Sequence, residues 1–231
     1  MTFRFTHYGR RELIAATLIY AVLAAIGAQL AARYSPWFWT MGIIAGIGWL
    51  WVLAFFRDPD RAAPAGPGLF VSPADGRVAD ITPLGPDSPL GCPGAQIGVF
   101  MNVLNVHVNR APCDGRIEDI VHRPGAFLDV RTNEAILRNE SATITLSHAY
   151  DGRRHPVIVR QVAGLVARRI VTDLKVGQTV HRGERIGMIK FGSRLELLIP
   201  NELLGEIRVQ VGQRVRGGLT VLVAAGPLEN Q

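Results

Sequence analysis

Residues 13–56 read LIAATLIYAVLAAIGAQLAARYSPWFWTMGIIAGIGWLWVLAFF, and Arg33 is the only formally charged residue among them. The stretch holds two uncharged runs, residues 13–32 and 38–56, each long enough as a helix to cross a hydrocarbon core of about 30 Å. All four tryptophans lie here, as is common near membrane interfaces. Because only residues 33–37 separate the runs, the stretch predicts a transmembrane hairpin with both ends on one side.

Arginines flank this hairpin unevenly. The turn carries Arg33 alone, whereas the two ends carry Arg4, Arg10, Arg11, Arg57 and Arg61. The positive-inside rule therefore predicts a cell (inner) membrane protein with its remaining residues on the cytoplasmic side. A cleaved signal peptide over the first run and a hairpin in a soluble core are the alternatives. The second run directly after the first, with tryptophans near its ends, favours lipid.

The chain after residue 56 has a different texture. Short runs rich in β-branched residues alternate with Gly, Pro and Asp, as in residues 76–81, 97–100, 142–146, 157–162 and 195–199. Such runs predict a mainly β body with lipoyl-like or barrel-like sandwich elements. A VGQxV pattern followed by glycine occurs at residues 176–183 and again at 211–218, which indicates pseudo-symmetric hairpins. We therefore expect two domains, 1–56 and 57–231.

Composition excludes several classes of protein. The 231 residues are 48% hydrophobic and include two cysteines, so disorder, collagen-like repeats and a disulfide scaffold are excluded. The chain has 25 Lys and Arg residues against 19 Asp and Glu residues. All of the basic residues except Lys175 and Lys190 are arginines. Arginine suits phosphate and carboxylate groups, which makes membrane lipids the expected anionic partner. No basic stripe with interleaved aromatics points to nucleic acid.

Familiar catalytic motifs are missing from the sequence. There is no HExxH or CxxC metal motif, no phosphate loop, no dinucleotide fingerprint and no GxSxG elbow, so no metal is expected. Three local clusters remain, at residues 55–78, 100–115 and 189–194. Taken singly they have ordinary structural readings: a membrane exit with an Asp-Gly turn, a buried histidine, and a β-bulge glycine.

Together, in this order, the clusters resemble the short form of the phosphatidylserine decarboxylase proenzymes. The matching segments are FFRDPDR at 55–61, SPADGRV at 72–78, NVHVNRAP at 105–112, ARRIV at 167–171 and RGERIGMIKFGSR at 182–194. The resemblance implies self-cleavage between Gly192 and Ser193, giving a β subunit of residues 1–192 and an α subunit of residues 193–231 that stay together as a heterodimer. It also implies that Ser193 becomes a covalent pyruvoyl cofactor, which forms a Schiff base with the substrate amine and accepts electrons as CO2 leaves.

The resemblance also assigns site residues. Asp75 and His107 match the acid and histidine positions of the family, which suggests a relay in which His107 takes the Ser193 proton and Asp75 orients the imidazole. Longer members have a second histidine where this chain has Arg110, so either His107 covers both roles or Asp75 acts directly. Arg110 is a candidate contact for the substrate phosphate or carboxylate, with a surface ion pair as the alternative.

The expected function is therefore decarboxylation of phosphatidylserine to phosphatidylethanolamine in phospholipid biosynthesis. Two alternatives remain at this point: decarboxylation of another serine-headed lipid, such as an ether lipid, and a noncatalytic, membrane-anchored, lipoyl-like binding module. The sequence leaves open whether the chain forms a higher homo-oligomer.

Overall fold

The computed structural model describes residues 4–129, 138–165, 169–190 and 193–226. By contacts within the chain, it divides into two compact units, Met1–Asp60 and Arg61–Gln231. The first unit contains the helices and the second contains the strands. The predicted fold class, a mainly β body with an N-terminal helical hairpin, is confirmed.

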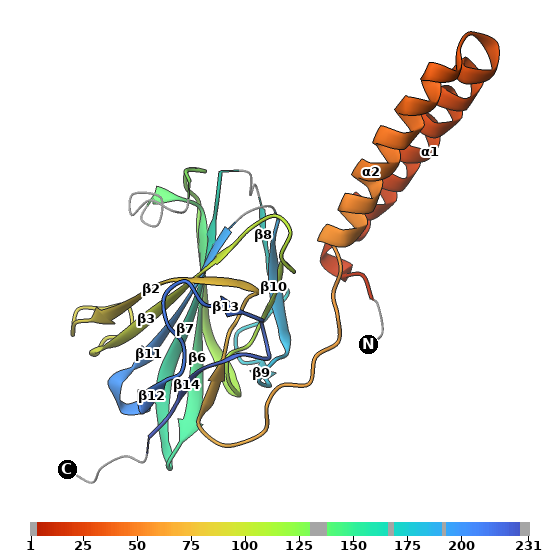
Figure 1. The fold of residues 1–231 in the computed structure, drawn as a ribbon. Coiled ribbons are helices and arrows are strands. Elements are labelled where there is room, and N and C mark those ends of the chain that lie inside the picture. The colour runs from red at the N-terminus through yellow and green to blue at the C-terminus, as the bar shows by residue number, and fades with distance from the viewer. Residues whose placement is uncertain (1–3, 130–137, 166–168, 191–192, 227–231) are drawn as a thin grey trace. The chain divides into compact units, whose positions relative to one another are not determined.

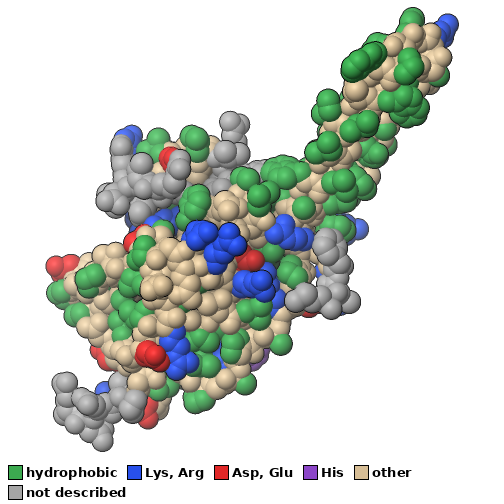
Figure 2. Space-filling model, viewed as in Figure 1, with side chains coloured by type: hydrophobic (Ala, Val, Ile, Leu, Met, Phe, Trp, Pro, Cys, Tyr) green, Lys and Arg blue, Asp and Glu red, His purple; other side chains and the backbone are tan. Residues whose placement is uncertain are grey.

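The first unit contains two apolar helices. They are α1 (Arg10–Arg33) and α2 (Trp39–Phe55), preceded by short 3-10 turns at His7–Gly9 (η1) and Pro36–Phe38 (η2). The turn between them forms because the Ser35 side chain accepts a hydrogen bond from the Trp37 amide and Pro36 opens the new turn. Both helices are long and apolar enough to cross a membrane by length and composition. Figure 2 shows hydrophobic side chains along their outer surface.

Small residues let the two helices pack closely. A side chain at Gly27 would come within 3.1 Å of the Phe38 carbonyl, and one at Gly42 would meet α1 at Ala24. The Trp49 indole donates a 3.0 Å hydrogen bond to the Thr17 hydroxyl. Aligned small residues are a common means of bringing apolar helices together.

The second unit is built from three antiparallel sheets, drawn in Figure 1. The eight-stranded sheet has the order β13-β2-β3-β11-β7-β6-β5-β9, and two three-stranded sheets have the orders β4-β10-β8 and β1-β14-β12. The strands are β1 (Leu69–Val71), β2 (Gly76–Leu84), β3 (Gly94–Met101), β4 (Val108–Arg110), β5 (Gly115–Arg123), β6 (Ser141–Tyr150), β7 (Arg153–Ala163), β8 (Arg169–Val171), β9 (Thr179–Val180), β10 (Arg185–Lys190), β11 (Ser193–Pro200), β12 (Glu206–Ile207), β13 (Arg214–Val215) and β14 (Val221–Ala224), with a 3-10 turn η3 (Asn201–Leu203).

β11 lies inside the large sheet, between β3 and β7, and every one of its residues is buried. A strand that is buried on both faces typically has a continuous run of apolar residues, and residues 195–200, LELLIP, are apolar except for the glutamate. Its Leu197 packs in a core with aliphatic side chains from the neighbouring strands, among them Val99 and Val159. The strand that begins at Ser193 is thus among the most enclosed parts of the body.

The repeated VGQxV segments occupy equivalent places. The Gly177 amide donates to the Ile117 carbonyl at 2.7 Å, and the Gly212 amide donates to the Val78 carbonyl at 2.8 Å. The strand after each then pairs with the start of a long strand, β9 with β5 and β13 with β2. The body therefore contains two similar halves, each built on an Asp-Gly turn that opens a long strand.

Candidate active site

Ser193 is the first residue of β11 and pairs with the last residues of both neighbouring strands, Met101 of β3 and Ala163 of β7. Its side chain is fully buried, and among the described residues its hydroxyl oxygen has no hydrogen-bond partner. A buried hydroxyl without a partner is costly, and such groups are uncommon outside functional sites. Gly192, the other residue of the expected cleavage bond, lies outside the described residues.

The expected cleavage bond falls where the chain passes from one sheet to another. β10 belongs to the small sheet, in which Met188 pairs with Val108 of β4 and Lys190 pairs with Arg169 of β8. Three residues later, Ser193 begins β11 of the large sheet. Hydrogen-bonded ladders therefore hold the chain firmly on both sides of residues 191–192.

His107 lies in the segment between β3 of the large sheet and β4 of the small sheet, which connects the same two sheets as the segment between β10 and β11. β3 ends at Met101, opposite Ser193, and β4 begins at Val108, opposite Met188. The connection between them therefore runs from one side of residues 191–192 to the other, and His107 is its last residue. The connection that carries His107 thus begins opposite the first residue of β11 and ends opposite β10.

The hydrogen bonding of His107 indicates which of its nitrogens can act as a base. The side chain is fully buried, and Nδ1 lies 2.9 Å from the backbone oxygen of Asn105. Because a carbonyl oxygen only accepts, this contact requires the proton on Nδ1 and leaves Nε2 as the basic nitrogen of the neutral ring. The geometry thus favours the tautomer that a general base at Nε2 needs.

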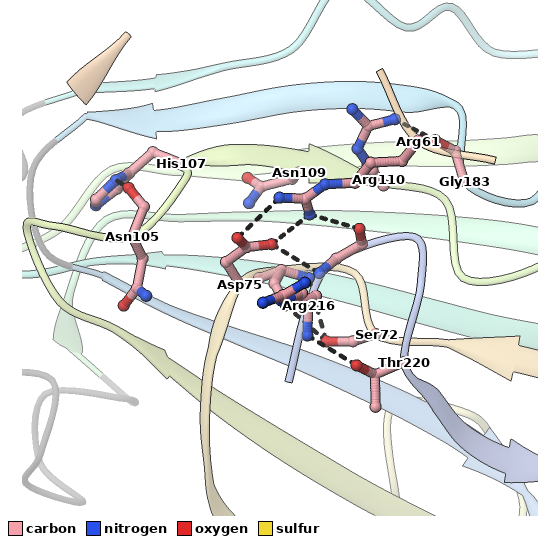
Figure 3. A network of polar contacts seen from close by, with 12 residues as sticks. Arg61, Ser72, Asp75, Asn105, His107, Asn109, Arg110, Gly183, Arg216 and Thr220 are labelled. Carbon is pink, nitrogen blue, oxygen red and sulfur yellow. Dashed lines mark hydrogen bonds and ion pairs between the residues drawn. The ribbon is translucent and has the colours of Figure 1, made fainter. Parts of the chain in front are cut away.

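Asp75 lies in the turn that opens β2 and is engaged from two directions, as Figure 3 shows. The Arg61 guanidinium donates to both carboxylate oxygens, and the Gly217 amide donates to Oδ1 at 2.7 Å. Arg61 also donates to the Gly217 carbonyl at 2.6 Å. The side chains of Arg61 and Asp75 are only 7% and 13% exposed, so this is a nearly buried ion pair.

These contacts bear on the expected relay. The hydrogen bonds described for Asp75 go to Arg61 and Gly217, and the Asn105 carbonyl orients the His107 imidazole. Figure 3 shows His107 beside Asn105, away from the Asp75 carboxylate. A direct Asp75–His107 hydrogen bond is not among the contacts of the described residues, and the relay stays a prediction.

Arg110 is buried at the end of β4 and is not a surface residue. Its Nη1 donates to the Gly183 carbonyl at 2.8 Å, and its backbone amide donates to the Pro73 carbonyl at 2.9 Å. A side chain at Gly218 would come within 2.8 Å of its Cδ atom. The surface alternative for Arg110 therefore does not hold, whereas its contact with substrate stays a prediction.

Comparison with known proteins decides the family. A sequence model described as phosphatidylserine decarboxylase matches residues 50–223. A phosphatidylserine decarboxylase proenzyme of Oleidesulfovibrio alaskensis is 42% identical over 202 residues, covering 87% of this chain and 89% of the relative. The proenzyme of Nitrobacter winogradskyi is 43% identical over 85% of this chain and 79% of the relative. That of Ruegeria pomeroyi is 45% identical over 76% and 82%.

The chain belongs to the phosphatidylserine decarboxylase family. The expectation of an enzyme of this family is thereby confirmed. Neither the noncatalytic binding module nor the ether-lipid alternative receives support from these comparisons. In the described ranges, no three His, Cys, Asp or Glu side chains come together as a metal site.

A buried amide pair beside the serine of this decarboxylase was missed from sequence. The Gln161 side chain donates a 2.7 Å hydrogen bond to Asn109, and both side chains are fully buried. Gln161 pairs with Leu195, two residues along β11 from Ser193, so it lies on the same face of the sheet as the serine. Its carbonyl oxygen has no partner in the described part of the chain. A glutamine within the apolar run of residues 157–163 was the available signal.

A charged network fixes the strand directly after Ser193. Arg194 pairs with Asp80 on β2, and its Nε donates to Glu196 at 2.8 Å, while Arg160 on β7 donates to the same glutamate at 2.5 Å. Burial alone would lower the pKa of Arg194, but its hydrogen bonds to Asp80 and Glu196 raise the pKa above the ordinary value. Arg194 therefore stays charged and ties the start of β11 to the strands on both sides.

Proposed function

We propose that this chain cleaves itself between Gly192 and Ser193, converts Ser193 into a pyruvoyl group, and decarboxylates phosphatidylserine to phosphatidylethanolamine. The observation that carries the proposal is the fully buried Ser193 hydroxyl, which has no hydrogen-bond partner among the described residues. Ser193 pairs with Met101, where the connection that carries His107 begins. The family supports the reaction class.

The cleavage step follows from ordinary acyl-transfer chemistry. Nε2 of His107 accepts the hydroxyl proton as the Ser193 oxygen attacks the Gly192 carbonyl carbon. A C–O bond forms, the C–N bond breaks, and the proton returns to the freed amine, which leaves an ester. Loss of the Ser193 α-proton then expels the Gly192 carboxylate, and hydrolysis of the resulting dehydroalanine releases ammonia.

The residues around Ser193 fit a pyruvoyl group at that position. Ladder pairing with β3 and β7 begins at Ser193 itself, and Arg194 is bound to Asp80 of β2 and to Glu196, so the new end of the α subunit would stay in place after cleavage. Such a group supplies an electrophilic carbonyl that takes up the substrate amine and accepts the electron pair released with CO2. Arg110, buried at the end of β4, would bind the phosphate or carboxylate of the lipid.

The same proposal includes the assembly and its location. Residues 1–192 form the β subunit and residues 193–231 the α subunit, and the two remain a heterodimer because β11 is enclosed between strands of the β subunit. The two apolar helices would anchor the protein in the inner membrane with the body on the cytoplasmic side.

Replacing Ser193 by alanine tests the proposal. Purified wild-type protein should run on a denaturing gel as fragments of roughly 21 and 4 kDa, in proportion to the residue counts of a 25.2 kDa chain, the smaller with a blocked N-terminus. Ser193→Ala should remain full length and release no CO2 from phosphatidylserine. Ser147→Ala, at another buried serine in a strand, is the control and should process normally. A Ser193→Ala chain that is cut or active would refute the proposal.

The role of His107 is tested separately. His107→Ala should stop cleavage because the hydroxyl loses its base, whereas His122→Ala, on β5 with a half-exposed side chain, should process normally. The measurement is the fraction of intact chain by mass spectrometry after a fixed time. Normal processing of His107→Ala would assign the base to another residue.

A further inference from the structure

Two loops that flank Ser193 expose apolar side chains. β3 ends at Met101, and the residues after it include Val103 and Leu104, which are 38% and 66% exposed. β7 ends at Ala163, and Leu165, two residues later, is 66% exposed. Because Met101 and Ala163 both pair with Ser193, these loops leave the sheet on opposite sides of the same buried serine. We call Val103, Leu104 and Leu165 the rim.

The exposure of the rim is built into its local structure. Asn102 and Asn105 close the first loop on itself, since the Asn105 side chain accepts from the Asn102 amide and the Asn102 side chain accepts from the Leu104 amide, both at 2.9 Å. This turn presents Leu104 outward, although burying a leucine side chain is favourable. A single exposed leucine is ordinary, but two on separate loops around one site need an explanation.

Charge near the rim suits a lipid surface. Arg169 is exposed at the start of β8, four residues after Leu165, and pairs in the sheet with Lys190. Figure 1 shows the connection between β3 and β4 at the same end of the body as β8. An arginine close to a bilayer surface attracts anionic head groups, and aliphatic side chains beside it enter the apolar layer.

We propose that the rim enters a phospholipid bilayer, so that the head group of a lipid reaches Ser193 while its acyl chains stay in the membrane. This inference rests on the proposed function, because it assumes that the substrate is a lipid. A bilayer is favoured over a protein partner because the rim is aliphatic and small and follows the two strand ends that pair with Ser193. It is also part of a chain that carries two helices apolar enough to span a membrane.

The first test measures the position of the rim directly. The native cysteines are Cys92, which is half-buried, and Cys113, which is buried. In full-length protein with Cys92→Ser and the buried Cys113 retained, a cysteine introduced at Leu104, Leu165 or Val176 is labelled with an environment-sensitive fluorophore. Each labelled protein is reconstituted into phosphatidylcholine–phosphatidylserine vesicles. Val176 is the control because it is 64% exposed but lies in the turn before β9. Lipids brominated on their acyl chains should quench the labels at 104 and 165 at least about twofold more than the label at 176. Equal quenching at all three positions would overturn the proposal.

The second test measures what the rim does for the reaction. Leu104→Ser/Leu165→Ser should cleave itself normally and keep its kcat/KM on a short-chain, monomeric phosphatidylserine, but lose about tenfold in kcat/KM on phosphatidylserine in vesicles. Val176→Ser/Val211→Ser removes two similarly exposed side chains elsewhere and should leave both substrates unaffected.

The outcomes separate the two proposals. If Leu104→Ser/Leu165→Ser loses kcat/KM equally on both substrates, or on neither, the proposal that the rim enters the bilayer is wrong. It is also wrong if a copurifying protein, and not lipid, shields the labels at the rim. If wild-type protein decarboxylates neither substrate, the proposed function fails, and acyl-chain quenching at positions 104 and 165 still decides whether the rim enters the bilayer.

Discussion

The body contains two Asp-Gly turns with the same local sequence pattern and very different surroundings. Asp75-Gly76-Arg77 opens β2, and Asp114-Gly115-Arg116 opens β5. Each aspartate accepts a backbone hydrogen bond from one of the two repeated VGQxV segments. Asp75 accepts from the Gly217 amide at 2.7 Å, and Asp114 accepts from the Arg182 amide at 3.0 Å. The two turns are thus held in the same way.

The difference lies in what surrounds each carboxylate. The Asp75 side chain is 13% exposed and bound by the Arg61 guanidinium, whereas that of Asp114 is 61% exposed and lies 3.5 Å from His181, which is 79% exposed. In the described part of the chain, the Asp114 carboxylate has no guanidinium partner comparable to Arg61. The same kind of turn therefore positions both aspartates, and only Asp75 is in addition nearly buried and bound by an arginine.

The largest expected effect comes from neutralising the two aspartates in turn. Asp75→Asn leaves Arg61 charged and nearly buried without its partner, which should lower the free energy of unfolding by about 3 kcal/mol. Asp114→Asn, at an exposed site where the amide oxygen can still accept the Arg182 hydrogen bond, should change it by less than about 0.5 kcal/mol. Denaturant unfolding in detergent, with self-cleavage followed in parallel, measures both.

A double variant separates stability from chemistry at Asp75. Asp75→Asn/Arg61→Gln removes both charges and should regain most of the lost stability. If cleavage returns as well, Asp75 acts only by holding the fold. If stability returns and cleavage does not, the carboxylate has a role in the reaction. Equal destabilisation by Asp75→Asn and Asp114→Asn would contradict the comparison itself.

The surroundings of the Asp114 turn should also make the stability of the protein sensitive to acid, through His148. His148 on β6 is buried, which lowers its pKa, although its Nδ1 lies 2.6 Å from the Asp114 carbonyl, a hydrogen bond that raises it. The folded state therefore binds this proton at a lower pH than the unfolded state, whose histidines titrate near 6.5. Stability should fall below about pH 6.5, by up to about 1.4 kcal/mol per pH unit from this group.

Comparing His148→Gln with wild type at pH 7.5 and 5.5 checks this expectation. The variant should lose less stability on acidification than wild type, since it has no proton to bind at this position. An identical pH dependence in both proteins would show that other groups cause the acid sensitivity.

The smallest difference in stability should come from matched substitutions in the two repeated VGQxV turns, because the two turns have the same backbone conformation. Gly177 and Gly212 both have a φ of +86°, in the left-handed region that favours glycine. Gly177→Ala and Gly212→Ala should each cost about 1 kcal/mol, by the same mechanism. Thermal unfolding measures both. Costs that differ by more than about twofold would show that the two turns are not equivalent.

The helical hairpin was predictable because its signal is local. Two long runs without charge, separated by a Ser-Pro turn, form helices at α1 and α2 whatever the rest of the chain does. The β character of the body was predictable for a similar reason, since short apolar runs between glycines and aspartates favour strands. The order of those strands was not, because pairing such as β11 between β3 and β7 joins segments about 30 to 100 residues apart.

The candidate site was predictable in its residue types and not in its contacts. Motif resemblance pointed to Asp75, His107, Arg110 and Ser193, but it did not give the Arg61 partner of Asp75 or the Asn105 contact of His107. Gln161 was missed because a polar residue in an apolar strand has no sequence context that shows what it faces.

The sequence by itself determined the two apolar helices, the β-rich body and the family to which the chain belongs. Only the tertiary structure decided which of two similar Asp-Gly turns is buried, and that Ser193 is enclosed between two strand ends. The physical reason is distance along the chain. Asp75 receives Arg61 from 14 residues away and Gly217 from 142 residues away, so its environment exists only once the sheets have closed around it.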